Sequence, residues 1–112
     1  MIAKPLVAAT LKPMMLSILA EGESYGYRII SRVQKLSKGQ MNWTTGTLYP
    51  LLHRLEKEGL VESFWRESPE GRRRKYYRLT PQGHEALVHE KQQWLDVHGM
   101  MAELWGLTPA AD

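Results

Sequence analysis

The sequence contains no cysteine, which excludes disulfide bonds, thiolate metal sites and cysteine nucleophiles. It also lacks a long apolar run. Lys4, Pro5, Lys12 and Pro13 interrupt the N-terminal segment, so it offers neither the core of a signal peptide nor the ~20 apolar residues that span a membrane. We therefore expect a cytoplasmic protein without a membrane partner.

The chain also has only a small net charge. The formal charge is only +3, so the overall balance says little about nucleic acid, and the positions of the cations say more. Four cationic residues, Arg72, Arg73, Arg74 and Lys75, follow a turn-forming Pro69–Gly71 segment. At a hairpin tip they would suit phosphates or a minor groove. The alternative is a solvated charge run.

Signatures of catalysis are missing too. His84, Glu85 and His89 approach the zinc-protease motif, but the histidines are five residues apart instead of four, which turns the second by ~140° on a helix. There is no glycine-rich phosphate loop and no Gly-x-Ser-x-Gly turn. In a chain of 112 residues, with room for one small domain, we predict no enzyme, no metal site and no cofactor.

Hydrophobic periodicity predicts three helices, at about 10–21, 24–37 and 44–58. If Thr10 caps the first, Pro13 falls in its first turn; if the helix starts near Lys4, Pro13 would kink it, and the residues leave both open. Ser24 is the expected cap of the second helix. The third helix directs one row of leucines inward, Leu48, Leu51, Leu52 and Leu55. It turns a polar row outward, Thr45, Tyr49, His53 and Glu56, and Pro50 should tighten or bend its first turns.

Residues 60–66 and 75–79 alternate as two antiparallel strands of a wing, and this alternation predicts opposite faces for Tyr76 and Tyr77. After Thr80, residues 81–107 predict a long helix with a heptad-like apolar seam, and 108–112 a loose tail. The predicted fold is thus mainly α with a small β-hairpin: a winged helix-turn-helix domain over residues 1–80, followed by a C-terminal dimerisation helix.

Several segments resemble PadR-like transcriptional regulators. The matches are LSILAEG followed by YGY at Tyr25–Tyr27, GTLYP at Gly46–Pro50, RLEKEGLV at Arg54–Val61 and GRRRKYYRLT at Gly71–Thr80. They cover most of residues 11–88. The length and the single C-terminal helix resemble the short branch of the family, whose members dimerise through that helix. Thr44 stands where the family usually has serine, and Trp43 where a small aliphatic residue is common.

The resemblance implies a helix in the major groove of a double-stranded DNA operator, with the wing on the backbone or the neighbouring minor groove. The implied DNA contacts are Tyr25, Thr45, Gly46, Thr47, Tyr49, His53, Arg54, Arg72, Arg73, Arg74 and Lys75. Together with the predicted dimer, it suggests a homodimeric repressor on a palindromic operator. The alternative is a winged-helix module that binds protein without specific DNA binding.

Trp94 has two interpretations. It packs the dimer seam, or two indole rings face each other across a two-fold axis and form a slot for a planar aromatic effector. His98 is interpreted as a polar residue of the interface, with a pH role left open. The predicted dimer and effector residues are Leu87, Lys91, Trp94, Leu95, His98, Met101 and Trp105.

Overall fold

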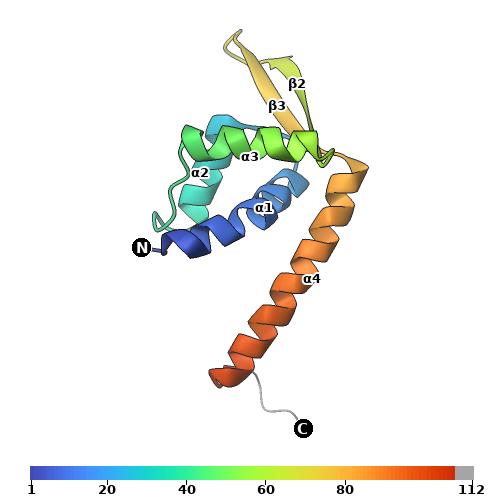
Figure 1. Cartoon of the computed structure of the whole chain (residues 1–112). Helices are drawn as coiled ribbons and strands as arrows, with labels where there is room; N and C mark the ends of the chain where they lie inside the picture. Colours follow the sequence, from blue (N-terminus) through green and yellow to red (C-terminus); the bar gives the residue numbers. More distant parts are fainter. Residues whose placement is uncertain (108–112) are drawn as a thin grey trace.

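The structure is a computed structural model that describes residues 1–107, so the predicted tail at 108–112 lies outside the described residues. Three helices, α1 (Lys4–Ala20), α2 (Gly26–Leu36) and α3 (Thr45–Lys57), lie beneath a β-hairpin, and a long helix, α4 (Pro81–Leu104), extends away from them (Figure 1). The predicted winged-helix fold with a long C-terminal helix is confirmed. Within the described residues, no helix is long and apolar enough to cross a membrane.

The core forms where the first three helices meet the sheet. The leucine row of α3 is buried as predicted, at Leu48, Leu51, Leu52 and Leu55. Met15, Leu16 and Leu19 of α1 and Ile29 and Val33 of α2 pack in the same cluster. Trp43, just before α3, is also buried there with 3% of its surface exposed, although its indole Nε1–H has no hydrogen-bond partner.

Of the two starts that the sequence left open for the first helix, the structure has the earlier one: α1 begins at Lys4 rather than near Thr10, the start used for the predicted range 10–21. Pro5 occupies the first turn and Pro13 lies inside the helix. The Thr10 hydroxyl does not cap but donates to the Val7 carbonyl at 2.7 Å. A proline leaves one helical hydrogen bond unmade. The turns before it still form, since Val7 packs against the core.

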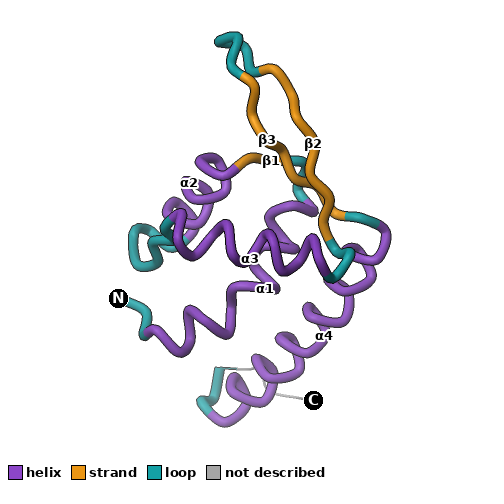
Figure 2. Tube along the Cα trace, turned by 45° about the horizontal axis from the view of Figure 1, so that its top comes forward, coloured by secondary structure: helices purple, strands orange, loops and turns teal. Residues whose placement is uncertain are grey.

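The predicted role of Ser24 was also wrong. Ser24 is buried in a short strand, β1 (Ser24–Tyr25), and α2 begins at Gly26 with no side-chain cap. β1 pairs antiparallel with β3, so the sheet has three strands in the order β1-β3-β2 (Figure 2). Two residues are too few to show alternation, which is why sequence periodicity could not detect this strand.

The wing strands are longer than predicted toward the turn. They run over β2 (Val61–Glu67) and β3 (Arg73–Leu79), which leaves only residues 68–72 in the turn. There the Ser68 hydroxyl accepts from the Arg72 N–H at 3.1 Å, and Gly71 adopts φ 85°. The prediction of four cations at the tip was therefore wrong: Arg72 alone is in the turn, while Arg73, Arg74 and Lys75 belong to β3.

Both tyrosines of β3 are buried, so the prediction of one inward and one outward ring was incomplete. They do point to opposite faces, but Tyr77 is 1% exposed in the core and Tyr76 is 6% exposed on the other side. Tyr76 is covered by aromatic rings, with Phe64 at 5.8 Å and Tyr25 at 5.3 Å between ring centroids. The missed β1 supplies Tyr25, and so explains the second burial.

The helix α4 is fixed at its first turn. As predicted, Thr80 is its N-cap and accepts from the Gly83 N–H at 3.1 Å. The Thr80 hydroxyl donates to the Gly59 carbonyl at 2.6 Å, and its N–H donates to the Leu60 carbonyl at 3.1 Å. A Cβ at Gly83 would overlap the Leu60 carbonyl, so only glycine fits at this crossing. The start of α4 is thereby held against the segment that follows α3.

Candidate nucleic-acid interface

The polar edge of α3 is formed by a capped first turn. The Thr44 hydroxyl accepts from the Thr47 N–H at 3.2 Å, which places Thr45 and Gly46 on the exposed first turn. Thr47 is only half-exposed, and its hydroxyl lies 3.4 Å from that of Thr44. The exposed edge continues through Tyr49, His53 and Arg54, the other predicted contacts of this helix.

Two motifs far apart in the sequence meet at this edge. Gly26, the first residue of α2, lies so close to Tyr49 that a Cβ would overlap the Tyr49 hydroxyl and stand 3.1 Å from Cζ. Leu48 Cδ2 would be 3.2 Å away. Gly26 therefore positions Tyr49, and sequence reasoning missed it. The available signal was a glycine at a helix start, where it lowers helix stability and needs a reason.

The wing has one face turned toward α3, which we call the α3-side face. On it, Ser63 donates to the Glu56 carboxylate at 2.7 Å and Tyr77 enters the core. Strand alternation adds Trp65, Lys75 and Arg73 to the same face nearer the turn. Among residues 1–107, neither Arg73 nor Lys75 forms an ion pair.

The opposite face, which we call the outer face, joins arginines to aromatic rings. Arg74 lies 4.4 Å from the centre of the Tyr25 ring, and Arg28 lies over the same ring at 4.8 Å. Arg66 and Arg78 stack on Phe64. Three of these arginines have carboxylate partners, in the pairs Arg74–Glu70, Arg66–Glu23 and Arg78–Glu62. The basic run is thus divided between the turn and two faces with different electrostatics.

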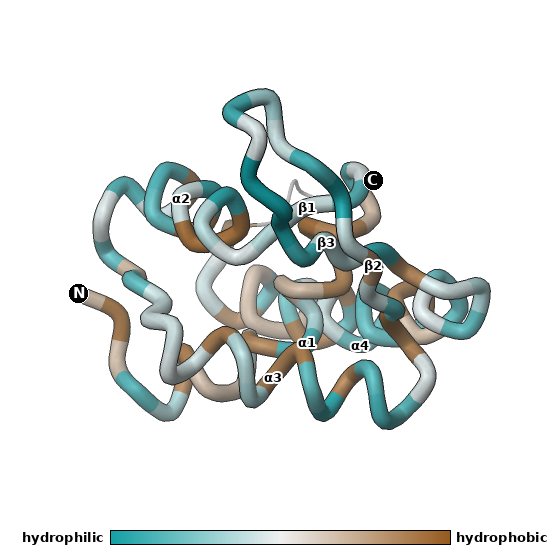
Figure 3. Tube along the Cα trace, turned by 90° about the horizontal axis from the view of Figure 1, so that it is seen from above, coloured by the Kyte–Doolittle hydropathy of each residue, from teal (hydrophilic) through white to brown (hydrophobic). Residues whose placement is uncertain are grey.

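Seen from above, a strongly hydrophilic stretch runs along the wing, whereas the most hydrophobic segments lie mainly in the helices (Figure 3). Burial raises the pKa of Tyr77 at the base of the wing, and the negative charge of Glu56 adds to the effect. At the C-cap of α1, the hydrogen bond from Arg32 lowers the pKa of Glu21. Within residues 1–107, no three His, Asp or Glu side chains lie close enough to hold a metal ion together.

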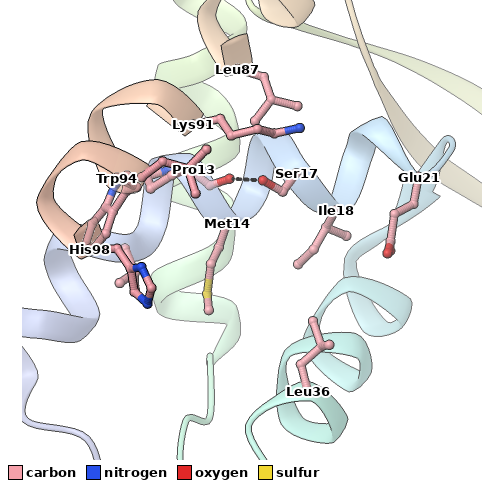
Figure 4. A pocket seen from close by; sticks show the side chains of 12 residues that line it. Pro13, Met14, Ser17, Ile18, Glu21, Leu36, Leu87, Lys91, Trp94 and His98 are labelled. Atoms are coloured by element: carbon pink, nitrogen blue, oxygen red, sulfur yellow. Dashed lines mark hydrogen bonds between the residues drawn. The ribbon is translucent and has the colours of Figure 1, made fainter. Parts of the chain in front are cut away.

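A second candidate site lies between α1 and α4. A cavity of about 460 Å³ is lined by five of the seven predicted dimer or effector residues, Leu87, Lys91, Trp94, Leu95 and His98. Met101 and Trp105 do not line it. The other wall comes mainly from α1, through residues that include Pro13, Met14 and Ser17, and Pro13 lies beside Trp94 (Figure 4). Leu36 of α2 also lines the cavity. The sequence had assigned α1 no role at this site.

The model of the "transcriptional regulator PadR-like family" matches residues 15–89, which include α2, α3 and the three strands of the candidate interface. The chain belongs to the PadR-like family. The sequence resemblance is confirmed, and this PadR-like protein is a transcriptional regulator with a winged-helix fold.

Solved structures of PadR-like and related regulators agree. A PadR-like transcriptional regulator from Bacillus cereus is 32% identical with a TM-score of 0.82, over 91% of this chain and 97% of that one. A transcriptional regulator from Clostridium thermocellum is 29% identical with a TM-score of 0.81, over 92% and 97% of the two chains. A transcriptional regulator from Mycobacterium tuberculosis is 46% identical over 59 residues, 53% of this chain and 54% of that protein. These relatives are regulators, a class that is in general not enzymatic.

Proposed function

We propose that this PadR-like protein is a homodimeric repressor that binds a palindromic DNA operator in the cytoplasm. The observation that supports it most is the meeting of two features on one side of the molecule. These are the hydroxyl-bearing edge of α3 and the cations of the α3-side face, which form no ion pair in the part of the chain that the structure describes. Residues 1–80 would bind one half-site, and α4 would join two copies. Repression then requires only that the operator be occupied.

In this proposal α3 enters the major groove. Thr45, Tyr49, His53 and Arg54 contact base edges or phosphates, and Gly46 lets the backbone approach closely. Thr47 and Tyr25 contact phosphates at the edges of the site. The wing holds the flank through Arg72, Arg73 and Lys75, with Arg74 as the cation nearest to Tyr25.

The test is the salt dependence of operator affinity for the Arg73→Ala/Arg74→Ala protein. Each lost phosphate contact should reduce the slope of log K against log salt by ~1, and affinity should fall for every DNA sequence. Tyr49→Phe should weaken operator binding without unfolding the domain. An unchanged slope would instead favour the alternative, a winged-helix module that binds protein.

Dimerisation is supported by the apolar surface of α4. Beyond Lys91 most side chains of this helix are exposed, including the large apolar ones Trp94, Leu95, Val97, Met100, Met101 and Leu104, and Trp105 at its C-cap is exposed as well. A surface of this kind is commonly covered by a partner, and a two-fold symmetric pair would place two copies of α3 about one DNA turn apart. Sedimentation of wild type and Leu95→Glu tests this, because the variant should be monomeric and fail to repress a reporter.

An effector is proposed for the cavity between α1 and α4. Its apolar wall and the Trp94 ring suit a planar aromatic molecule, and binding there would change the position of α4 and so the spacing of two α3 helices. Titration of the protein–operator complex with planar aromatic compounds should release DNA and change Trp94 fluorescence. A panel that alters neither signal would remove the effector from the proposal.

A further inference from the structure

Trp65 is exposed in a way that its size does not favour. Tryptophan is the largest apolar side chain, yet 58% of the surface of Trp65 is open to solvent, against 3% for Trp43 in the core. It lies on β2 directly opposite Lys75 in the strand register. The only aromatic or cationic contact of its ring in the described residues is the guanidinium of Arg73, 5.2 Å from the ring centre.

The orientation of Trp65 follows from the pleat of the strand. Ser63, two residues earlier, donates to Glu56 of α3, so this side of β2 is the α3-side face. Trp65 therefore points to the same side as the polar edge of α3, and beyond the part of the wing that the core covers. The strands β2 and β3 rise above α3 toward the turn (Figure 1), and 58% of the surface of Trp65 stays open to solvent.

The charges beside Trp65 differ from those on the outer face. There, Arg66, Arg74 and Arg78 each have a carboxylate partner. On the α3-side face, Arg73 and Lys75 have none in the described residues, although Glu67 lies opposite Arg73 in the register. The exposed indole is thus flanked by two cations that form no ion pair within residues 1–107.

We propose that Trp65 is a DNA-contacting residue. Its indole ring packs against the sugar of the duplex backbone beside the major-groove site, while Arg73 and Lys75 bind the phosphates on either side. An aromatic ring can bury the apolar face of a deoxyribose, and unpaired cations suit the neighbouring phosphates. Contacts of this type fix position and contain no sequence information. The inference rests on the proposed DNA-binding function and adds a residue that the sequence motifs did not assign.

The test measures the affinity of labelled operator and of a scrambled duplex across a salt series for four variants. Trp65→Ala should weaken both duplexes by about tenfold, without changing their ratio or the salt slope, since the indole bears no charge. Arg73→Ala should reduce the slope by ~1. Trp65→Phe should retain most of the affinity. Arg78→Ala is the matched control, because Arg78 is on the outer face and paired with Glu62 at 2.7 Å.

A fluorescence measurement keeps the inference testable if Trp65→Ala does not fold. The difference in emission between wild type and Trp65→Phe reports Trp65, and DNA should protect that emission from acrylamide. Trp65→Ala that binds as wild type, or Trp65 emission that stays equally quenched with DNA, would overturn the inference while the proposed function stands. A wild-type protein with no salt-dependent affinity for either duplex would overturn both.

Discussion

Replacing Gly26 by alanine should change stability with a sign that depends on residue 49. In a helix, alanine is favoured over glycine by about 0.5–1 kcal/mol. Here the added Cβ would overlap the Tyr49 hydroxyl and would stand 3.1 Å from Cζ. Overpacking of this kind costs about 1–3 kcal/mol. Since Tyr49 is 37% exposed and its hydroxyl end can swing outward, the cost should be at the lower end.

Gly26 is the first residue of α2, so the helix gain should be about 0.5 kcal/mol, and the overpacking should cost about 1–1.5 kcal/mol. The expected result for Gly26→Ala in the wild-type background is therefore a net loss of about 0.5–1 kcal/mol of stability. In the Tyr49→Phe background the hydroxyl is gone, and the remaining neighbours at 3.1 and 3.2 Å need to move only slightly. The same substitution should then gain about 0.5 kcal/mol, so the coupling between the two positions should be about 1–1.5 kcal/mol.

The assay is urea unfolding of wild type, both single variants and the double variant, with operator affinity measured for each. Gly26→Ala should also weaken operator binding, because a displaced Tyr49 loses its proposed contact. Two changes that add within about 0.3–0.5 kcal/mol would refute the reasoning, since they would show that Gly26 and Tyr49 do not constrain each other.

Three further predictions concern other contacts. Gly83→Ala should lower the free energy of unfolding by about 1–3 kcal/mol or more, because the added Cβ meets the rigid Leu60 carbonyl. Gly99→Ala in the same helix is the matched control: its Cβ meets nothing within 4 Å, so it should raise the free energy of unfolding by about 0.5–1 kcal/mol. Thermal unfolding of the two variants measures the difference. Thr44→Ala should lose about 1 kcal/mol of stability with the cap to the Thr47 N–H, and Thr44→Ser should restore it. Burial raises the pKa of Tyr77 above 10.0, so its contribution to stability is complete below pH 10.0 and lost as pH rises through the folded-state value. Tyr77→Phe should flatten the alkaline decline of the unfolding free energy, and an equally steep decline would contradict this assignment.

Much of the helical fold could be predicted because periodicity records which face is buried. The leucine row of α3 and the cap at Thr80 follow directly from residue spacing and from capping chemistry. The start of α1 could not be predicted, since two placements of Pro13 are locally allowed and the choice depends on packing of Val7 against distant residues. Tertiary contacts decided it.

The sequence identified the basic residues of the candidate interface but not how the fold arranges them. The basic run was identified, yet its division between two faces depends on where β3 begins, and Arg73 is already a strand residue. Strand boundaries are weakly encoded in a stretch of charged residues. Gly26 and the α1 wall of the cavity were missed because each acts through a contact between segments far apart in sequence.

The contacts of Thr80 with Gly59 and Leu60 fix the first turn of α4 beside the end of α3, so the rest of α4 is a rigid arm that extends from this point. With 24 residues the helix is about 36 Å long, so a tilt of 5° at this point displaces the far end by about 3 Å. Two hydrogen bonds from Thr80 and the close crossing at Gly83 restrict rotation of α4 relative to α3 at this point. Whatever binds the distal end of α4 therefore sets the orientation of α3, and a displacement of about 3 Å at that end corresponds to a rotation of only about 5°.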